Sequence, residues 1–232
     1  ERGSVGLDIR IVLKGLISDI TTMIYEPTLK EVSKLLNKHY LTVVTNNNCI
    51  KKLDIEDFLN VPPSGIIYTK LNPNDYVKDV LLVSDSLDIV IYSDRKALRI
   101  NMKDIPKYKR STLGVSAMNL SDNQCIDGIS VVYPDVTDII VITESGYINK
   151  FDITGLQVSN RYKSGSSVIK LKKTDKIHSI FGVNDKNVIN IITTNNKLSI
   201  PVSEIPKGSS LSSGVRKLQS KNEAIVKCSI TK

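Results

Sequence analysis

Runs of apolar, β-branched residues alternate with short polar turns along most of this chain. In residues 139–153, IIVITESGYINKFDI, four apolar residues lead into a Ser- and Gly-containing turn, and polar and apolar positions then alternate. This pattern is typical of a β-hairpin, in which successive side chains point to opposite faces. Segments 41–55, 89–102 and 189–202 follow the same pattern. The sequence therefore predicts four hairpins.

The four hairpins recur at a nearly constant interval. Aligning them on the apolar residue near the end of the second strand selects Leu53, Ile100, Phe151 and Ile200, which are 47, 51 and 49 residues apart. A second kind of unit precedes each of the last three hairpins, and each copy contains an apolar run on both sides of a polar turn. These units cover residues 65–83, 113–132 and 166–183. The sequence thus predicts four strands in every repeat of about fifty residues.

Partial copies of the repeat occupy both ends. Residues 214–230 match the second kind of unit, and residues 4–24 resemble a degenerate copy of it. Between that copy and the first hairpin, apolar residues at helical spacing follow Pro27, so we expect a short inserted helix over residues 26–40. We interpret residues 1–232 as one domain, with a partial first blade and the helix in 1–40, repeated blades in 41–213 and closing strands in 214–232.

Four strands per repeat of this length indicate an all-β, propeller-like array of four-stranded blades. A β-sandwich would not predict such internal similarity. The half-copies at the two ends would permit strands to be exchanged between blades, and the sequence alone leaves that exchange open.

The composition argues against several classes of function. No apolar run approaches the length of a membrane span, so we expect a soluble, cytoplasmic protein without a membrane partner. Cys49, Cys125 and Cys228 are odd in number and widely spaced, which favours reduced thiols over disulfides. With only His39 and His178 as histidines, a metal cluster or a His-based acid–base pair is not expected. We therefore predict no catalytic residue, no metal and no cofactor.

The charge balance points to a polyanionic partner. Lys and Arg total 32 against 24 Asp and Glu, which gives a formal net charge of +8. Such an excess attracts polyanions, chiefly nucleic acid or an anionic membrane surface. Aromatic residues make up only 5% of the chain and Trp is absent, so a platform for stacking single-stranded bases is not expected. This composition favours contact with the backbone of a duplex.

The basic residues recur with the predicted blades, in hairpin turns, outer strands and connectors. If the blades stack, these residues form a curved track that could follow duplex DNA from phosphate to phosphate. The candidate DNA-binding residues are Lys51, Lys52, Arg95, Lys96, Arg99, Lys107, Lys109, Arg110, Lys150, Arg161, Lys163, Lys170, Lys172, Lys173, Lys207, Arg216 and Lys217.

Several segments of the predicted hairpins resemble the blade repeats of a known family. VVTNNNCIKKLDIEDF, IYSDRKALRINMKDIP, VITESGYINKFDI and SIPVSEIP are similar to repeats in the C-terminal domain of the A subunits of bacterial type IIA topoisomerases, DNA gyrase and topoisomerase IV. The resemblance spans residues 41–231. It implies a β-pinwheel, in which strands are swapped between blades and a basic perimeter binds and bends duplex DNA without reading its sequence.

The resemblance also implies a context for the chain. The domain would be non-catalytic and monomeric when isolated. It would act at the nucleoid, where it presents DNA to the catalytic domains of the same A subunit. The B subunit would be the partner of that A subunit in an ATP-dependent enzyme. Gyrase A subunits carry a glutamine-arginine-arginine-glycine-glycine-lysine-glycine box in one connector. This chain does not reproduce the box, and only RYKSGSS from Arg161 and KRSTLG from Lys109 are weakly similar to it. The absence of the box favours topoisomerase IV or a divergent gyrase.

Two functions of other classes remain open. A protein-interaction propeller would bind its partner on one face of the disc and would show an apolar or mixed patch there. A propeller hydrolase or lyase would need His, Asp and Arg to converge at the central channel. The two histidines lie far apart in the repeat, which argues against the second alternative.

Overall fold

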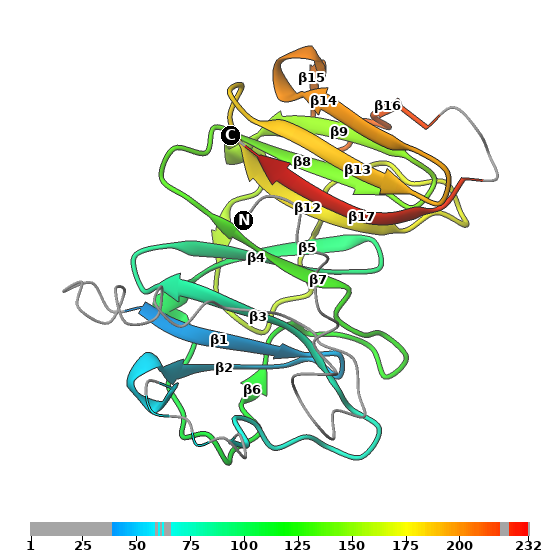
Figure 1. Cartoon of the computed structure of the whole chain (residues 1–232). Coiled ribbons are helices and arrows are strands. Elements are labelled where there is room, and N and C mark those ends of the chain that lie inside the picture. Colours follow the sequence, from blue (N-terminus) through cyan, green and yellow to red (C-terminus); the bar gives the residue numbers. More distant parts are fainter. Residues whose placement is uncertain (1–38, 59, 61, 63–65, 219–222, 232) are drawn as a thin grey trace, which may run out of the picture.

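Four β-hairpins form the centres of four successive sheets, or blades (Figure 1). The computed structural model describes residues 39–58, 60, 62, 66–218 and 223–231. The hairpins of blades 1 to 4 are β1 (His39–Thr45) with β2 (Cys49–Asp54), β4 (Asp88–Ser93) with β5 (Lys96–Asn101), β8 (Asp138–Thr143) with β9 (Tyr147–Asp152), and β13 (Val188–Thr193) with β14 (Lys197–Pro201). The four predicted hairpins are confirmed.

Turn chemistry explains why the chain reverses at these points. In blade 1 the backbone of Asn48 has φ of +69°, and in blade 3 Gly146 has φ of +80°. Gly and Asn adopt this left-handed conformation most readily among the residues. The hydroxyl of Thr45 accepts a hydrogen bond from the Cys49 amide, and the hydroxyl of Thr143 accepts one from the Tyr147 amide. Polar turn residues thus fix the register of each of these two hairpins.

Each hairpin gains an inner strand from the chain that follows it. The inner strands are β3 (Val77–Ser84), β7 (Gly128–Val132), β12 (Ile177–Val183) and β17 (Ile225–Thr231). Each pairs antiparallel with the first strand of its hairpin. The inner strands also contact one another in the order β3, β7, β12 and β17, so they line the centre of the array.

Before forming each later inner strand, the chain returns to the outer edge of an earlier blade. It pairs there as β6 (Val115–Ser116) with β2, as β10 (Val158–Ser159) and β11 (Ser166–Ser167) with β5, and as β15 (Lys207–Gly208) and β16 (Val215–Arg216) with β9. This is the strand exchange that the sequence left open. Blade 4 has three strands, β14, β13 and β17, among the described residues.

A single 3₁₀ turn ends each hairpin and redirects the chain. These turns are η1 (Ile55–Phe58), η2 (Met102–Asp104), η3 (Ile153–Gly155) and η4 (Val202–Glu204). The side chain of Asn101 accepts a hydrogen bond from the Lys103 amide, and that of Asp152 accepts one from the Thr154 amide. Capping of the free amides by these side chains stabilises the turns.

The hydrophobic core lies between the blades, because inner blades bury both faces of their sheets. In β4, Ile89 and Ile91 pack toward blade 1, whereas Val90 and Tyr92 pack toward blade 3. A third cluster joins blades 3 and 4, and a fourth covers the other face of blade 1. This two-sided burial explains the nearly continuous apolar runs in the first hairpin strands. The expected all-β, propeller-like pinwheel is confirmed.

Two expectations differ from the structure or lie outside it. The sequence predicts two full strands in the second kind of repeat unit, but the first strand is only two residues long in β6, β11 and β16, and residues 66–76 contain no strand. In each unit with such a short strand, the chain pairs with the outer strand of an earlier blade over only two residues and then runs toward the inner strand, so most of its first half forms no strand. The helix expected over residues 26–40 lies outside the described residues except for His39 and Tyr40, which belong to β1. The degenerate unit in 4–24 also lies outside them.

Candidate nucleic-acid interface

Three equivalent loops form the outer edge of blades 1, 2 and 3. They cover residues 107–116, 158–167 and 207–216, and each begins beside the second hairpin strand in a parallel pairing and returns to it antiparallel. Gly114, Gly165 and Gly214 occupy the same position in the three loops, with φ of +102°, +72° and +68°. A Cβ atom on Gly214 would lie 2.4 Å from the Ile148 carbonyl oxygen. Glycine therefore permits the close return of each loop.

The outer loops and the adjoining turns carry most of the candidate cations that face solvent. Among the described residues, seven of the candidate cations are exposed or half-buried and form neither an ion pair nor a side-chain hydrogen bond. They are Lys96, Lys109, Arg110, Lys163, Lys170, Lys173 and Lys217, which we call the rim cations. Lys172 is also exposed or half-buried, but its Nζ donates to the Tyr147 hydroxyl and lies 4.9 Å from the centre of that ring.

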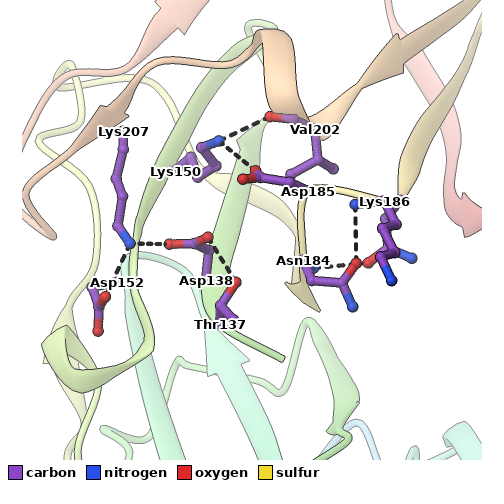
Figure 2. A network of polar contacts seen from close by, with 10 residues as sticks. Thr137, Asp138, Lys150, Asp152, Asn184, Asp185, Lys186, Val202 and Lys207 are labelled. Carbon is purple, nitrogen blue, oxygen red and sulfur yellow. Dashed lines mark hydrogen bonds and ion pairs between the residues drawn. The ribbon is translucent and has the colours of Figure 1, made fainter. Parts of the chain in front are cut away.

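Two equivalent lysines at the start of the outer loops are paired with carboxylates. Lys107 Nζ lies 3.2 Å from Asp54 Oδ2. Figure 2 shows the equivalent Lys207, whose Nζ lies 2.6 Å from Asp138 Oδ1 and 2.9 Å from Asp152 Oδ2. Hydrogen bonds to Asp138 and Asp152 raise the pKa of Lys207 to about 12. A hydrogen bond to Asp54 also raises the pKa of Lys107. These lysines remain partly exposed, but their charge is locally compensated.

Three arginines use their guanidinium groups to fasten loops to neighbouring backbone. Arg95 donates to the carbonyl oxygens of residues 172, 173 and 175. Arg161 donates to the Ser116 carbonyl oxygen at 2.5 Å, and Arg216 donates to the Ser145 carbonyl oxygen at 3.4 Å. A guanidinium has five N–H donors, so Arg95 and Arg161 keep donors for a further acceptor.

Three candidate residues, Lys52, Arg99 and Lys150, lie between blades rather than on the rim. Lys52 Nζ lies 2.5 Å from Asp85 Oδ1 and donates to the Met102 carbonyl oxygen of blade 2. Figure 2 shows the equivalent Lys150, whose Nζ lies 3.2 Å from Asp185 Oδ1 and donates to the Val202 carbonyl oxygen of blade 4. We call Lys52, Arg99 and Lys150 the junction cations.

Arg99 occupies the same position in blade 2 with a different acid. It pairs with Asp88 of its own hairpin at 2.8 Å and also donates to the Leu156 carbonyl oxygen of blade 3. Lys52 and Lys150 are only 4% and 5% exposed. The structure therefore places these two ammonium groups where a phosphate cannot reach them, and we do not carry them into the proposed interface.

Lys51 has a separate role as a buried support for the outer loop of blade 1. Its side chain is 1% exposed, and its Nζ donates to the carbonyl oxygens of Lys109, Arg110 and Thr112 at 3.4, 2.8 and 2.7 Å. Burial lowers the pKa of this ammonium group to about 8. Lys51 therefore cannot contact DNA directly, but it fixes the backbone that carries two rim cations.

The partners of these buried cations were not predicted from the sequence. Asp85 and Asp185 follow the inner strands of blades 1 and 3 and lie 100 residues apart, two periods of the repeat. Asn149 was missed as well: it occupies the position of Lys51 in blade 3 and donates to the Ser209 carbonyl oxygen of the outer loop. The spacing of the two acids was a usable signal. Whether a basic side chain points between blades or toward solvent could not be predicted without knowing which strands pair.

The described residues offer little for other chemistry. No group of three or more His, Cys, Asp or Glu side chains suited to a metal ion occurs in the described part of the chain. His178 Nδ1 lies 2.7 Å from the Ser179 hydroxyl, and burial lowers the pKa of this histidine. The short helical turns described above are not long and apolar enough to cross a membrane.

Comparison with known families and sequences gives a consistent result. The model of the DNA gyrase C-terminal domain, a β-propeller, matches residues 39–84, 93–132 and 137–184, more than half of the chain. The DNA gyrase A subunit of Haloquadratum walsbyi is 28% identical over 141 residues, covering 60% of this chain and 16% of the relative. That of Kosmotoga olearia is 26% identical over 198 residues, covering 83% of this chain and 24% of the relative. The chain thus spans about a fifth of the length of these relatives.

Solved structures share the fold. The C-terminal domain of DNA topoisomerase IV superposes with a TM-score of 0.77 at 21% identity, covering 85% of this chain and 63% of that one. The DNA gyrase A C-terminal domain superposes with a TM-score of 0.74, also at 21% identity, covering 84% of this chain and 66% of that one. At this identity the likeness concerns the architecture of the array.

Proposed function

Because this chain belongs to the DNA gyrase C-terminal domain family, we propose that it binds duplex DNA along the outer loops of its blades, without sequence preference and without catalysing a reaction. The observation that supports this most directly is the set of rim cations. Lys109, Arg110 and Lys163 lie on equivalent loops of successive blades and have no carboxylate partner among the described residues. Cations arranged in this way can follow phosphates along a duplex.

The backbone of the outer loops supports the same function. The loops are rich in Ser and Gly, as in SGSS at 164–167 and GSSLSSG at 208–214. Small residues allow close approach, and hydroxyl and amide groups can donate hydrogen bonds to phosphate oxygens. None of these contacts depends on base identity. The proposed binding is therefore electrostatic and tolerant of sequence.

In its parent protein the domain would hold and bend a DNA segment for a type IIA topoisomerase. The chain spans about a fifth of its gyrase A relatives. Catalytic domains of the same polypeptide, a B-subunit partner and ATP-dependent strand passage therefore belong to the proposed whole enzyme at the nucleoid. The loops contain no close copy of the glycine-rich basic box of gyrase. We therefore favour topoisomerase IV or a divergent gyrase, with the isolated domain monomeric.

The salt dependence of binding tests this function. Fluorescence anisotropy of labelled 40-base-pair duplexes of unrelated sequence should give similar affinities that fall steeply with salt. The double variant Lys109→Ala/Lys163→Ala should weaken binding to all duplexes alike and reduce the slope of log affinity against log salt by about 1.8, or about 0.9 for each lost phosphate contact.

A matched control removes the same charge elsewhere. Lys103 in η2 and Lys186 in the turn between β12 and β13 are exposed and lie outside the outer loops. Lys103→Ala/Lys186→Ala should leave the salt slope nearly unchanged. Equal effects of the two double variants, or binding by the unmodified domain that does not respond to salt, would contradict the proposed interface.

A further inference from the structure

Two exposed apolar side chains occupy the same position at the tips of neighbouring outer loops. Tyr162 in the loop of blade 2 is 55% exposed, and Leu211 in the loop of blade 3 is 60% exposed. They lie 49 residues apart, and each precedes a residue whose carbonyl oxygen accepts an amide hydrogen bond, from Asn119 and Lys170 respectively. The equivalent residue in blade 1 is Ser111, which precedes Thr112 in the same arrangement.

The backbone on both sides of Tyr162 is fixed. The Tyr162 amide donates to the Ala117 carbonyl oxygen, and the Lys163 carbonyl oxygen accepts from the Asn119 amide, both at 3.0 Å. The Arg161 guanidinium donates to the Ser116 carbonyl oxygen. Tyr162 itself has φ of +62°, a conformation that is rare for a bulky residue. An exposed aromatic ring held on strained backbone is more typical of a binding residue than of an incidental surface residue.

The tip of the blade 3 loop is fixed in a similar way. The Ser212 hydroxyl donates to Asn149 Oδ1 at 2.5 Å, and Asn149 Nδ2 donates to the Ser209 carbonyl oxygen at 3.0 Å. These two bonds bracket Leu211 and join its loop to β9. Both apolar tips are therefore displayed by rigid loops, with rim cations on or beside them.

We propose that Tyr162 and Leu211 enter the minor groove of the bound duplex and pack against its deoxyribose walls. This inference rests on the function proposed above. A minor groove is about 6 Å wide and accommodates a single side chain, whereas the wider major groove suits a helix. In blade 2, Arg161 and Lys163 flank the ring in sequence, as expected for cations that reach the two backbones on either side of a narrow groove.

The contact gives the interface a part that salt does not weaken. Phosphate contacts alone would let the duplex rotate about its axis, because phosphates recur along both strands. An apolar side chain in the groove instead sets the points at which a minor groove faces the protein. Blades 2 and 3 would make these contacts, whereas blade 1, with Ser111, would contribute only phosphate contacts.

Single tryptophan reporters test the inference, because the chain contains no Trp. The three single variants are Tyr162→Trp, Leu211→Trp and, as a control, Tyr133→Trp. Tyr133 is 53% exposed and lies in the turn between β7 and β8, away from the outer loops. Quenching by acrylamide is measured with and without a saturating duplex, and binding is followed separately by the anisotropy of labelled DNA.

Duplex binding should reduce quenching several-fold at positions 162 and 211 and leave it unchanged at 133. A bound duplex that leaves positions 162 and 211 as accessible as in the free domain would overturn the groove contact while leaving the proposed function intact. Failure of the duplex to bind at all would overturn both.

A second variant separates groove contact from charge. Tyr162→Asn removes the ring but suits the left-handed backbone, so the loop should keep its shape. It should weaken duplex binding roughly three- to tenfold with the same salt slope as the unmodified domain. Lys163→Ala should instead reduce the slope. A changed slope for Tyr162→Asn, or unchanged affinity, would contradict the groove contact.

Discussion

The junction cations and the rim cations both occur in successive blades but lie in opposite environments. Lys52 and Lys150 are buried between blades and bonded to an aspartate and a backbone carbonyl oxygen. Lys109 and Lys163 are exposed on the outer loops and have no such partner among the described residues. The basic residues of successive blades thus serve two purposes in this molecule. Position within the repeat decides whether a lysine joins two blades or faces solvent.

Blade 4 shows how specific the junction position is. The residue equivalent to Lys52 and Lys150 there is Ser199, whose hydroxyl donates to Asn190 Oδ1 at 2.8 Å. Both side chains lie on the face of blade 4 that contacts no other blade among the described residues. A basic residue thus occupies this position where another blade packs against the sheet, and a small polar residue occupies it where the face of the sheet is open to solvent. The junction cation is therefore part of the stacking of blades.

The largest effect on this stacking is expected from the apolar part of a junction. Phe151 is 1% exposed and belongs to the cluster between blades 2 and 3. Phe151→Ala should lower the free energy of unfolding by about 3–5 kcal/mol, because it removes a large buried ring and leaves a cavity. Urea unfolding followed by circular dichroism measures the change. An unfolding midpoint equal to that of the unmodified domain would contradict the assigned register.

A smaller effect is expected from the polar part of a junction. Lys150→Met should lower the free energy of unfolding by about 1–3 kcal/mol, because the Val202 carbonyl oxygen loses its buried donor while the exposed Asp185 is solvated. Under conditions in which the variant is folded, the salt slope of DNA binding should not change. The control is Lys197→Met, at an exposed position of β14, which should be nearly neutral. A reduced salt slope for Lys150→Met would show that this lysine contacts phosphate.

The sequence predicts the array well because repetition supplies the same evidence several times. Leu53, Ile100 and Phe151 are all buried, Leu53 on the outer face of blade 1 and the other two between blades, and all four hairpins lie where their turn residues predict. Pairing between distant segments was not predictable in the same way. Residues 158–159 and 166–167 pair with a strand about sixty to seventy residues earlier, and two-residue contacts leave no detectable periodicity.

The candidate interface was only partly predictable for a related reason. In β2, Lys51 and Lys52 are adjacent and must point to opposite faces of the sheet, yet both are buried. Lys52 faces blade 2, and Lys51 supports the outer loop of its own blade. Which neighbour covers each face depends on strand exchange. Lysines within strands therefore could not be assigned from charge and spacing, whereas exposure is easier to predict for lysines in connectors.

The smallest and most specific effect is expected in the pH dependence of the free energy of unfolding. It follows from a difference between two outer loops, because the loop of blade 1 is held by an ammonium group and that of blade 3 by a side-chain amide. Lys51 bonds to the loop of blade 1, and Asn149 bonds to that of blade 3. The pKa of Lys51 is about 8 in the folded domain, compared with 10.5 in an unperturbed lysine. Between these values the unfolded chain binds more protons than the folded domain, so the stability contribution of Lys51 rises with pH.

Lys51→Met removes this titration while keeping a side chain of similar length. The free energy of unfolding of the unmodified domain relative to Lys51→Met should be constant below about pH 7 and should rise by on the order of 1 kcal/mol by pH 9. Asn149→Leu is the matched control, since it removes the hydrogen bonds of the blade 3 loop without removing a titrating group. Its difference from the unmodified domain should not vary over the same range. If the Lys51→Met difference were equally flat, Lys51 would have an ordinary pKa, and the loop of blade 1 would not depend on a buried, desolvated ammonium.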